Sequence, residues 1–172
     1  MFFNHFKQTP MNTSSPIFQD HMPGNICYGC GKDHPEGLKI KSYWEGEEAV
    51  CVWNSEDKYQ GWKGLLNGGV LATLVDCHCM CTALAGAYKY ENRSLDSEPV
   101  YRFATGTMTI KYTAPTSNDH PIEIRASIKE IKGKKVTMDF TVFSQGQPTA
   151  EGEVIAIRVF SSADPVKSVF SE

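Results

Sequence analysis

The fold is decided by residues 66–76, LNGGVLATLVD, where two glycines open an apolar helix that carries one carboxylate, Asp76. Burying an ionised carboxylate costs free energy unless it is paired or hydrogen bonded, so Asp76 calls for a specific explanation. The first turn of the helix, at Gly68 and Gly69, presents backbone N–H groups without intrahelical partners at the positive end of the helix dipole. Such an end suits an oxyanion or a polarised carbonyl. The segment therefore indicates acyl chemistry.

Length and composition predict one ordinary domain. The chain has 172 residues, of which 41% are hydrophobic and 22% charged, enough for a single core. Its formal charge of −3 gives no bulk attraction to nucleic acid or to an anionic membrane. No uninterrupted apolar run approaches the roughly 20 residues that span a bilayer, and residues 1–20 lack the apolar centre of a signal peptide. We expect a cytoplasmic protein with no nucleic-acid or membrane partner.

Six cysteines are expected to be free thiols, because a chain of this length with its own core needs no disulfide framework. Cys27 and Cys30 have the spacing of half a zinc site, but no second pair with that spacing follows. Cys77 and Cys81 share one helix face, yet a free cysteine is more often a small buried hydrophobe than a ligand. We expect no metal and no cofactor.

The chain divides into an irregular N-terminal arm (1–25), one domain (26–160) and a C-terminal tail (161–172). Residues 38–44 and 48–53 predict a hairpin, and the polar residues 54–66 a loop. Residues 69–88 are apolar on nearly every face, which predicts a buried helix. Four alternating segments follow, at 103–113, 122–131, 136–143 and 150–160. In the first of these, Met108, Ile110 and Tyr112 share one face, and Thr107, Thr109 and Lys111 share the other. The fold class is therefore α+β, with a curved antiparallel sheet of about five to six strands around one long helix.

Three motifs occur in order: CYGCG at 27–31 with HPEGL at 34–38, QGW at 60–62 leading through NGG at 67–69 to Asp76, and YTAP at 112–115. Together they span about residues 25–160. The chain resembles the hotdog-fold acyl-CoA thioesterases, particularly the phenylacetate-pathway type and its human thioesterase-superfamily relatives. The resemblance implies the hotdog fold, protomers that join their sheets edge to edge, and active sites at the dimer interface.

The resemblance also assigns roles to residues. It implies that the backbone N–H of Gly68 polarises the thioester carbonyl, that Asp76 is the catalytic acidic residue, and that Thr105 holds the attacking water. Asn67 stands where relatives usually have histidine; an amide donates a hydrogen bond or caps the helix but exchanges no proton near neutral pH. Asn67, Gly69 and Gln60 are the candidate substrate-binding residues.

Spacing predicts how these residues combine. Gly68 and Asp76 are eight residues apart, which is roughly 12 Å along one helix axis, so they do not hold the same carbonyl. If both act in one site, they come from different subunits of a homodimer; whether dimers pair into a tetramer stays open. We predict hydrolysis of an acyl-CoA thioester to a free acid and coenzyme A, with Asp76 as general base or as nucleophile. The sequence does not decide which acyl group is preferred, or whether the natural thioester is on coenzyme A or on a carrier protein.

Other interpretations compete with this one. A hotdog hydratase needs a catalytic histidine paired with a carboxylate, and His78 is expected to face away from Asp76. A non-catalytic module that binds an acyl group or acyl-CoA would use the same groove. For single residues, Asp76 is alternatively a buried carboxylate satisfied by Thr73, Gln60 an ordinary loop amide, and Thr107 a competitor of Thr105.

Overall fold

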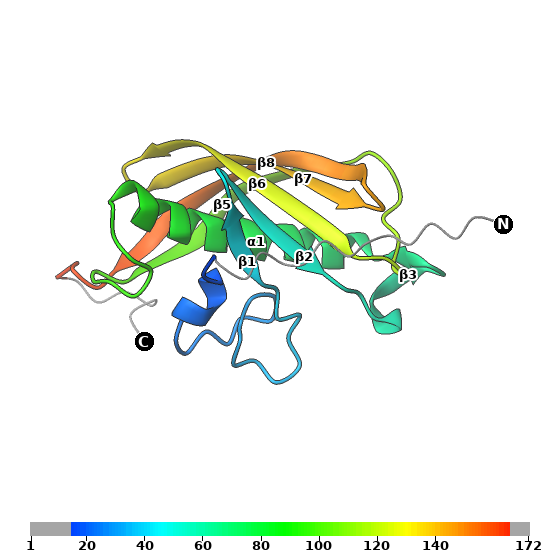
Figure 1. The fold of residues 1–172 in the computed structure, drawn as a ribbon, viewed down its shortest axis with the longest axis horizontal. Helices are drawn as coiled ribbons and strands as arrows, with labels where there is room; N and C mark the ends of the chain where they lie inside the picture. Colours follow the sequence, from blue (N-terminus) through cyan, green and yellow to red (C-terminus); the bar gives the residue numbers. More distant parts are fainter. Residues whose placement is uncertain (1–14, 166–172) are drawn as a thin grey trace.

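The computed structural model describes residues 15–165. A six-stranded antiparallel sheet curves around one long helix, α1 (Gly68–Tyr90), as Figure 1 shows. The strands lie side by side in the order β1 (Ser42–Glu45), β2 (Glu48–Trp53), β6 (Ile122–Lys132), β7 (Lys135–Ser144), β8 (Gln147–Ser161) and β5 (Tyr101–Tyr112). This confirms the predicted α+β hotdog architecture.

Helix α1 is the core of the molecule. Its side chains are apolar on nearly all sides, and the described part of the chain contacts it through the sheet strands and through the short 3-10 helix η1 (Phe18–His21). By length and composition alone α1 could cross a membrane, but 72% of its apolar segment is buried inside the protein. Its composition is therefore explained by burial against the sheet.

The sheet faces the helix with one side of each strand. In β7, Val136, Met138, Phe140 and Val142 are buried, and the alternate residues between them are more exposed. Period-two alternation of this kind places one apolar face against the core. The observed bounds of the strands after the helix lie within a few residues of the predicted ones, because this alternation is strong.

Strand β5 departs from simple alternation at Gly106. The register with β8 shifts between Thr105 and Thr107, so an extra residue bulges out of β5. A bulge reverses which face the following residues occupy. Thr105 therefore points toward α1, as Met108 does. Thr107, which lies between them after the bulge, is on the opposite face. The alternation inferred from the sequence holds only from Thr107 onward.

Two local predictions were wrong. The segment predicted as a loop at 54–66 contains the 3-10 helix η2 (Asp57–Tyr59) and a small hairpin of β3 (Gln60–Trp62) and β4 (Leu65–Leu66). Its turn is possible because Gly64 adopts a φ of 76°, which glycine tolerates. The first strand is shorter than predicted, because the N–H groups of Leu38 and Ile40 bond instead to the carbonyls of Tyr28 and Gly29 in the cysteine turn.

The N-terminal arm lies outside the described residues up to residue 14, and Phe18–His21 within it form η1. Gln19 of η1 belongs to a buried polar chain. Its amide Nε2 donates to Ser42 Oγ (3.0 Å), which lies 2.9 Å from His78 Nδ1, and His78 Nε2 lies 3.2 Å from the Ala49 carbonyl. Burial lowers the pKa of His78 to about 4, despite the backbone hydrogen bond from Nε2, so the ring is neutral at pH 7. His78 is a core residue that faces away from Asp76, as expected.

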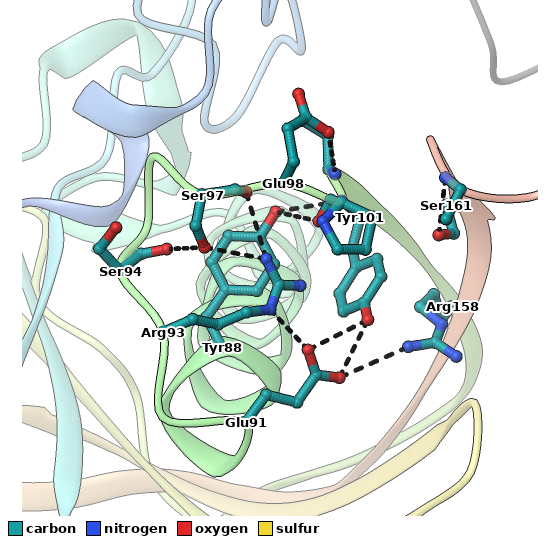
Figure 2. A network of polar contacts seen from close by, with 12 residues as sticks. Tyr88, Glu91, Arg93, Ser94, Ser97, Glu98, Tyr101, Arg158 and Ser161 are labelled. Atoms are coloured by element: carbon teal, nitrogen blue, oxygen red, sulfur yellow. Dashed lines mark hydrogen bonds and ion pairs between the residues drawn. The ribbon is translucent and has the colours of Figure 1, made fainter.

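The C-terminal end of α1 is clamped to the sheet (Figure 2). The Arg93 guanidinium lies 4.0 Å from the ring centre of Tyr88 and 4.6 Å from that of Tyr101, and its Nε donates to Glu91 at 2.6 Å. The Tyr101 hydroxyl also donates to Glu91, and Arg158 of β8 lies over the Tyr101 ring. These contacts fix the C-terminal end of α1 against β5 and β8.

Candidate active site

The first turn of α1 is capped by Asn67. Its Oδ1 accepts hydrogen bonds from the N–H groups of Gly69 (2.8 Å) and Val70 (3.2 Å). Asn67 itself is extended, with φ −64° and ψ 130°, which is the backbone of a helix N-cap. Among the described residues this cap leaves the N–H of Gly68 without a partner. Gly68, and not Gly69, therefore offers a free donor at the positive end of the helix.

Gly68, which carries this donor, is one of the residues that line a hollow of about 410 Å³. The hollow is lined on one side by Gly68 and Leu71 of α1, on a second by the β3–β4 hairpin, and on a third by the end of β5 and the residues that follow it. Most of this lining is apolar, which is the usual make-up of a site for an acyl group. The helix terminus thus meets an apolar hollow at one point, Gly68.

Two exposed aromatic residues of this hollow were not among the predicted site residues. Trp62 is 82% exposed and Tyr112 is 52% exposed, and the Tyr112 hydroxyl donates to the Gly68 carbonyl at 2.8 Å. Large apolar side chains left this open often mark a ligand or protein contact. Trp62 belongs to the QGW motif and Tyr112 to the YTAP motif. Both motifs contributed to the family resemblance, but neither aromatic residue was itself predicted to be in the site.

The carboxylate lies elsewhere along the helix. Asp76 is half-buried, and its Oδ1 accepts a hydrogen bond from the Thr105 hydroxyl of β5. The bulge at Gly106 makes this contact possible, because it turns Thr105 toward the helix. Thr73 does not satisfy Asp76, since its hydroxyl donates to the Gly69 carbonyl (3.0 Å). The structure therefore brings Thr105 and Asp76 into contact, whereas the role in holding water that the resemblance gives to Thr105 stays a prediction.

The two halves of the candidate site are separate within one chain. The described residues that line the hollow include Gly68 but neither Asp76 nor Thr105. Gly68 and Asp76 occupy positions on one continuous helix about 12 Å apart along its axis. One chain thus presents a carbonyl-binding donor at one place and a hydrogen-bonded carboxylate at another.

The side-chain amide of Gln60 is hydrogen bonded at both ends. Its Nε2 donates to Asp57 Oδ1 (3.2 Å), and its Oε1 accepts from the Gly64 N–H (2.6 Å). Both ends of the amide are thus used locally, one by η2 and the other by the turn of the β3–β4 hairpin. Gln60 is not among the described residues that line the hollow, and its role in binding substrate stays a prediction.

This fold is that of the hotdog-fold thioesterases. The family model described as the thioesterase superfamily matches residues 63–151, just over half of the chain. The chain therefore belongs to the thioesterase superfamily. No curated protein sequence matches it at a significant level.

Solved structures of the same fold include a thioesterase superfamily protein from Shewanella loihica PV-4, which is 29% identical with a TM-score of 0.58. That match covers 70% of this chain and 91% of the other. The Escherichia coli PaaI protein from the phenylacetic acid degradation operon is 13% identical, with a TM-score of 0.58 and coverage of 72% and 82%. A Streptococcus mutans UA159 protein solved bound to acetyl CoA is 16% identical, with a TM-score of 0.55 and coverage of 69% and 86%. At these lower identities the likeness is one of fold.

Proposed function

We propose that this protein hydrolyses an acyl-CoA thioester to a free acid and coenzyme A at a site shared by two subunits. The single observation that carries the proposal is the unpartnered Gly68 N–H on an apolar hollow, with the Asp76–Thr105 pair about 12 Å along the same helix. A donor for the carbonyl oxygen and a carboxylate for water are the two groups that thioester hydrolysis requires. Gly68 of one subunit and Asp76 of its partner would complete one site.

Strand β5 supports the dimer. It lies at the edge of the sheet and, within the described residues, is hydrogen bonded only along its β8 side. A twelve-residue edge strand with a free row of backbone donors and acceptors is a template for pairing with another strand. Two copies of β5 related by a twofold axis would run antiparallel and join the sheets. The arrangement also places Thr105 of β5 near the subunit boundary.

The proposed reaction begins with the thioester carbonyl oxygen on the Gly68 N–H, where the helix dipole stabilises developing negative charge. Asp76 of the partner takes a proton from water as the water oxygen bonds to the carbonyl carbon. The tetrahedral intermediate then collapses, the carbon–sulfur bond breaks, and the proton passes from Asp76 to the departing thiolate. Thr105 donates to Oδ1 of Asp76 and so orients the carboxylate.

The second route is direct attack by Asp76 on the carbonyl carbon, which expels the thiolate and forms a mixed anhydride that water then hydrolyses. A single turnover in ¹⁸O-labelled water separates the two routes. The general-base route puts the label into the product acid and leaves Asp76 unlabelled, whereas the anhydride route can transfer an enzyme oxygen to the product.

Coenzyme A as the leaving group is supported by the Streptococcus mutans neighbour solved with acetyl CoA and by membership of the thioesterase superfamily. The test is a panel of short-chain, aromatic and long-chain acyl-CoAs, with release of free thiol as the readout. We expect turnover of at least one class, because the hollow is apolar and accepts an acyl group. Binding across the panel without thiol release would contradict the proposal and favour a non-catalytic acyl-binding module.

A further inference from the structure

The two cysteine motifs that are far apart in the sequence meet in space. The turn that carries Cys27 and Cys30 packs against the face of α1 that carries Cys77, with 3.6 Å between the sulfurs of Cys27 and Cys77. The sulfurs of Cys27, Cys30 and Cys77 all lie within 4.8 Å of one another. The helix therefore brings a further cysteine to the Cys27–Cys30 pair, which by its spacing is half of a zinc site. The sequence did not reveal this contact.

A fourth thiol joins this group from the next helical turn. Cys81 lies four residues after Cys77, on the same face of α1. Its sulfur lies 3.8 Å from that of Met22, and the neighbouring Cys30 thiol and burial raise the pKa of Cys81. Hydrogen bonds with the thiols of Cys27, Cys77 and Cys81 lower the pKa of Cys30 well below its usual range, although burial opposes this. We define these four residues as the cysteine cluster.

The backbone around the cluster is built for this close approach. The Gly31 N–H donates to the Cys27 carbonyl (2.8 Å) and closes the turn. A Cβ at Gly29 would overlap the Cys77 sulfur, so glycine is needed for the turn to reach the helix. The Asn25 amide lies 3.4 Å from the Cys30 sulfur as a donor. Such outer contacts orient ligands and offset their negative charge.

We propose that Cys27, Cys30, Cys77 and Cys81 bind one Zn²⁺ ion that joins the N-terminal turn to the core helix. A tetrahedral site with bonds of about 2.3 Å places its sulfurs about 3.8 Å apart, close to the 3.6 Å between Cys27 and Cys77. Zinc favours four thiolates in this geometry and replaces their protons. An iron–sulfur cluster needs room between its ligands for several iron and sulfide atoms, and a group this tight fits a single ion better.

The ion would act as a structural link, because four protein ligands leave no open position for water or substrate. Cys77 follows Asp76 directly in the sequence but packs on the turn, whereas Asp76 faces Thr105. The zinc proposal therefore does not depend on the proposed function. It replaces the expectation from the sequence that no metal is bound, which treated each cysteine pair by itself.

Metal analysis of the full-length protein purified without chelator tests the proposal. We expect one zinc ion per chain, and we expect Co²⁺ added to the metal-free protein to give the intense visible absorption of a tetrahedral thiolate site. The Cys27→Ser and Cys30→Ser variants are expected to lose the ion and the absorption. Because Cys27 is exposed, its replacement removes a ligand without opening a hole in the core.

Cys51→Ala is the matched control, since Cys51 is a buried cysteine of β2 outside the cluster, and it is expected to keep the ion. Absence of both zinc and the Co²⁺ absorption in the wild-type protein would overturn the proposal. So would a Cys27–Cys77 disulfide that lowers the free thiol count from six to four in the presence of zinc. Unchanged zinc affinity in Cys81→Ala would contradict the assignment of the fourth ligand.

Discussion

Replacement of Asp76 by asparagine is expected to lower kcat for acyl-CoA hydrolysis by about 10² to 10⁴, the usual contribution of a positioned general base. Asparagine has nearly the same shape and its Oδ1 can still accept the Thr105 hydrogen bond, but the amide takes no proton from water. The measurement is the rate of thiol release with the best substrate of the panel. Gel filtration and thermal unfolding of the same sample show whether the assembly and the fold are intact.

Asp139→Asn is the matched control for Asp76→Asn. Asp139 is an exposed carboxylate of β7, paired with Lys129 on the outer part of the sheet, and its replacement is expected to leave the rate unchanged. A folded Asp76→Asn variant with the full wild-type rate would show that this carboxylate takes no part in the reaction.

The second large effect is expected from Gly68→Pro compared with Gly68→Ala. Proline at Gly68 adds a ring and removes the backbone N–H that we assign to the carbonyl oxygen, and loss of one such donor typically lowers the rate by about 10² to 10³. Alanine keeps this N–H. A Cβ at Gly68 would lie 3.7 Å from the Tyr112 ring, which is an ordinary contact, so the backbone donor is the main difference between the variants.

The backbone of this turn tolerates proline. Gly68 is the first helical residue, where proline is common because its missing N–H has no helical partner. The preceding residue, Asn67, is already extended with ψ 130°, as a residue before proline prefers. The paired result expected is a folded but slow proline variant and an alanine variant with most of its activity. Equal rates for both variants would remove Gly68 from the mechanism.

The overall fold was predictable from the sequence because its signals are long and regular. The helix is apolar on nearly every side, and β7 alternates over its ten residues, so small errors do not change the pattern. The family resemblance selected Thr105 as a site residue, but its hydrogen bond to Asp76 was not predicted, because simple alternation places Thr105 on the outer face. The bulge at Gly106 turns Thr105 from the outer face to the face that contacts α1.

Features formed by short or distant segments were not predictable in this way. The β3–β4 hairpin has strands of three and two residues, too short to show a period. The cysteine cluster joins residues about fifty positions apart, and spacing within either segment does not reveal their contact. The cap formed by Asn67 was one of two roles open to its amide, and only the geometry of the first turn decides between them.

The most direct test of the shared site is the activity of a heterodimer that carries Asp76→Asn in one subunit and Gly68→Pro in the other. The two variants are coexpressed with different affinity tags, and the mixed dimer is isolated through both tags. If each site takes Gly68 from one subunit and Asp76 from its partner, one of the two sites is intact, and the heterodimer recovers about half of the wild-type rate. A matched heterodimer with both substitutions in the same subunit is then inactive. The reverse result, an inactive first heterodimer and a half-active second one, would place Gly68 and Asp76 of one chain in the same site and contradict the account.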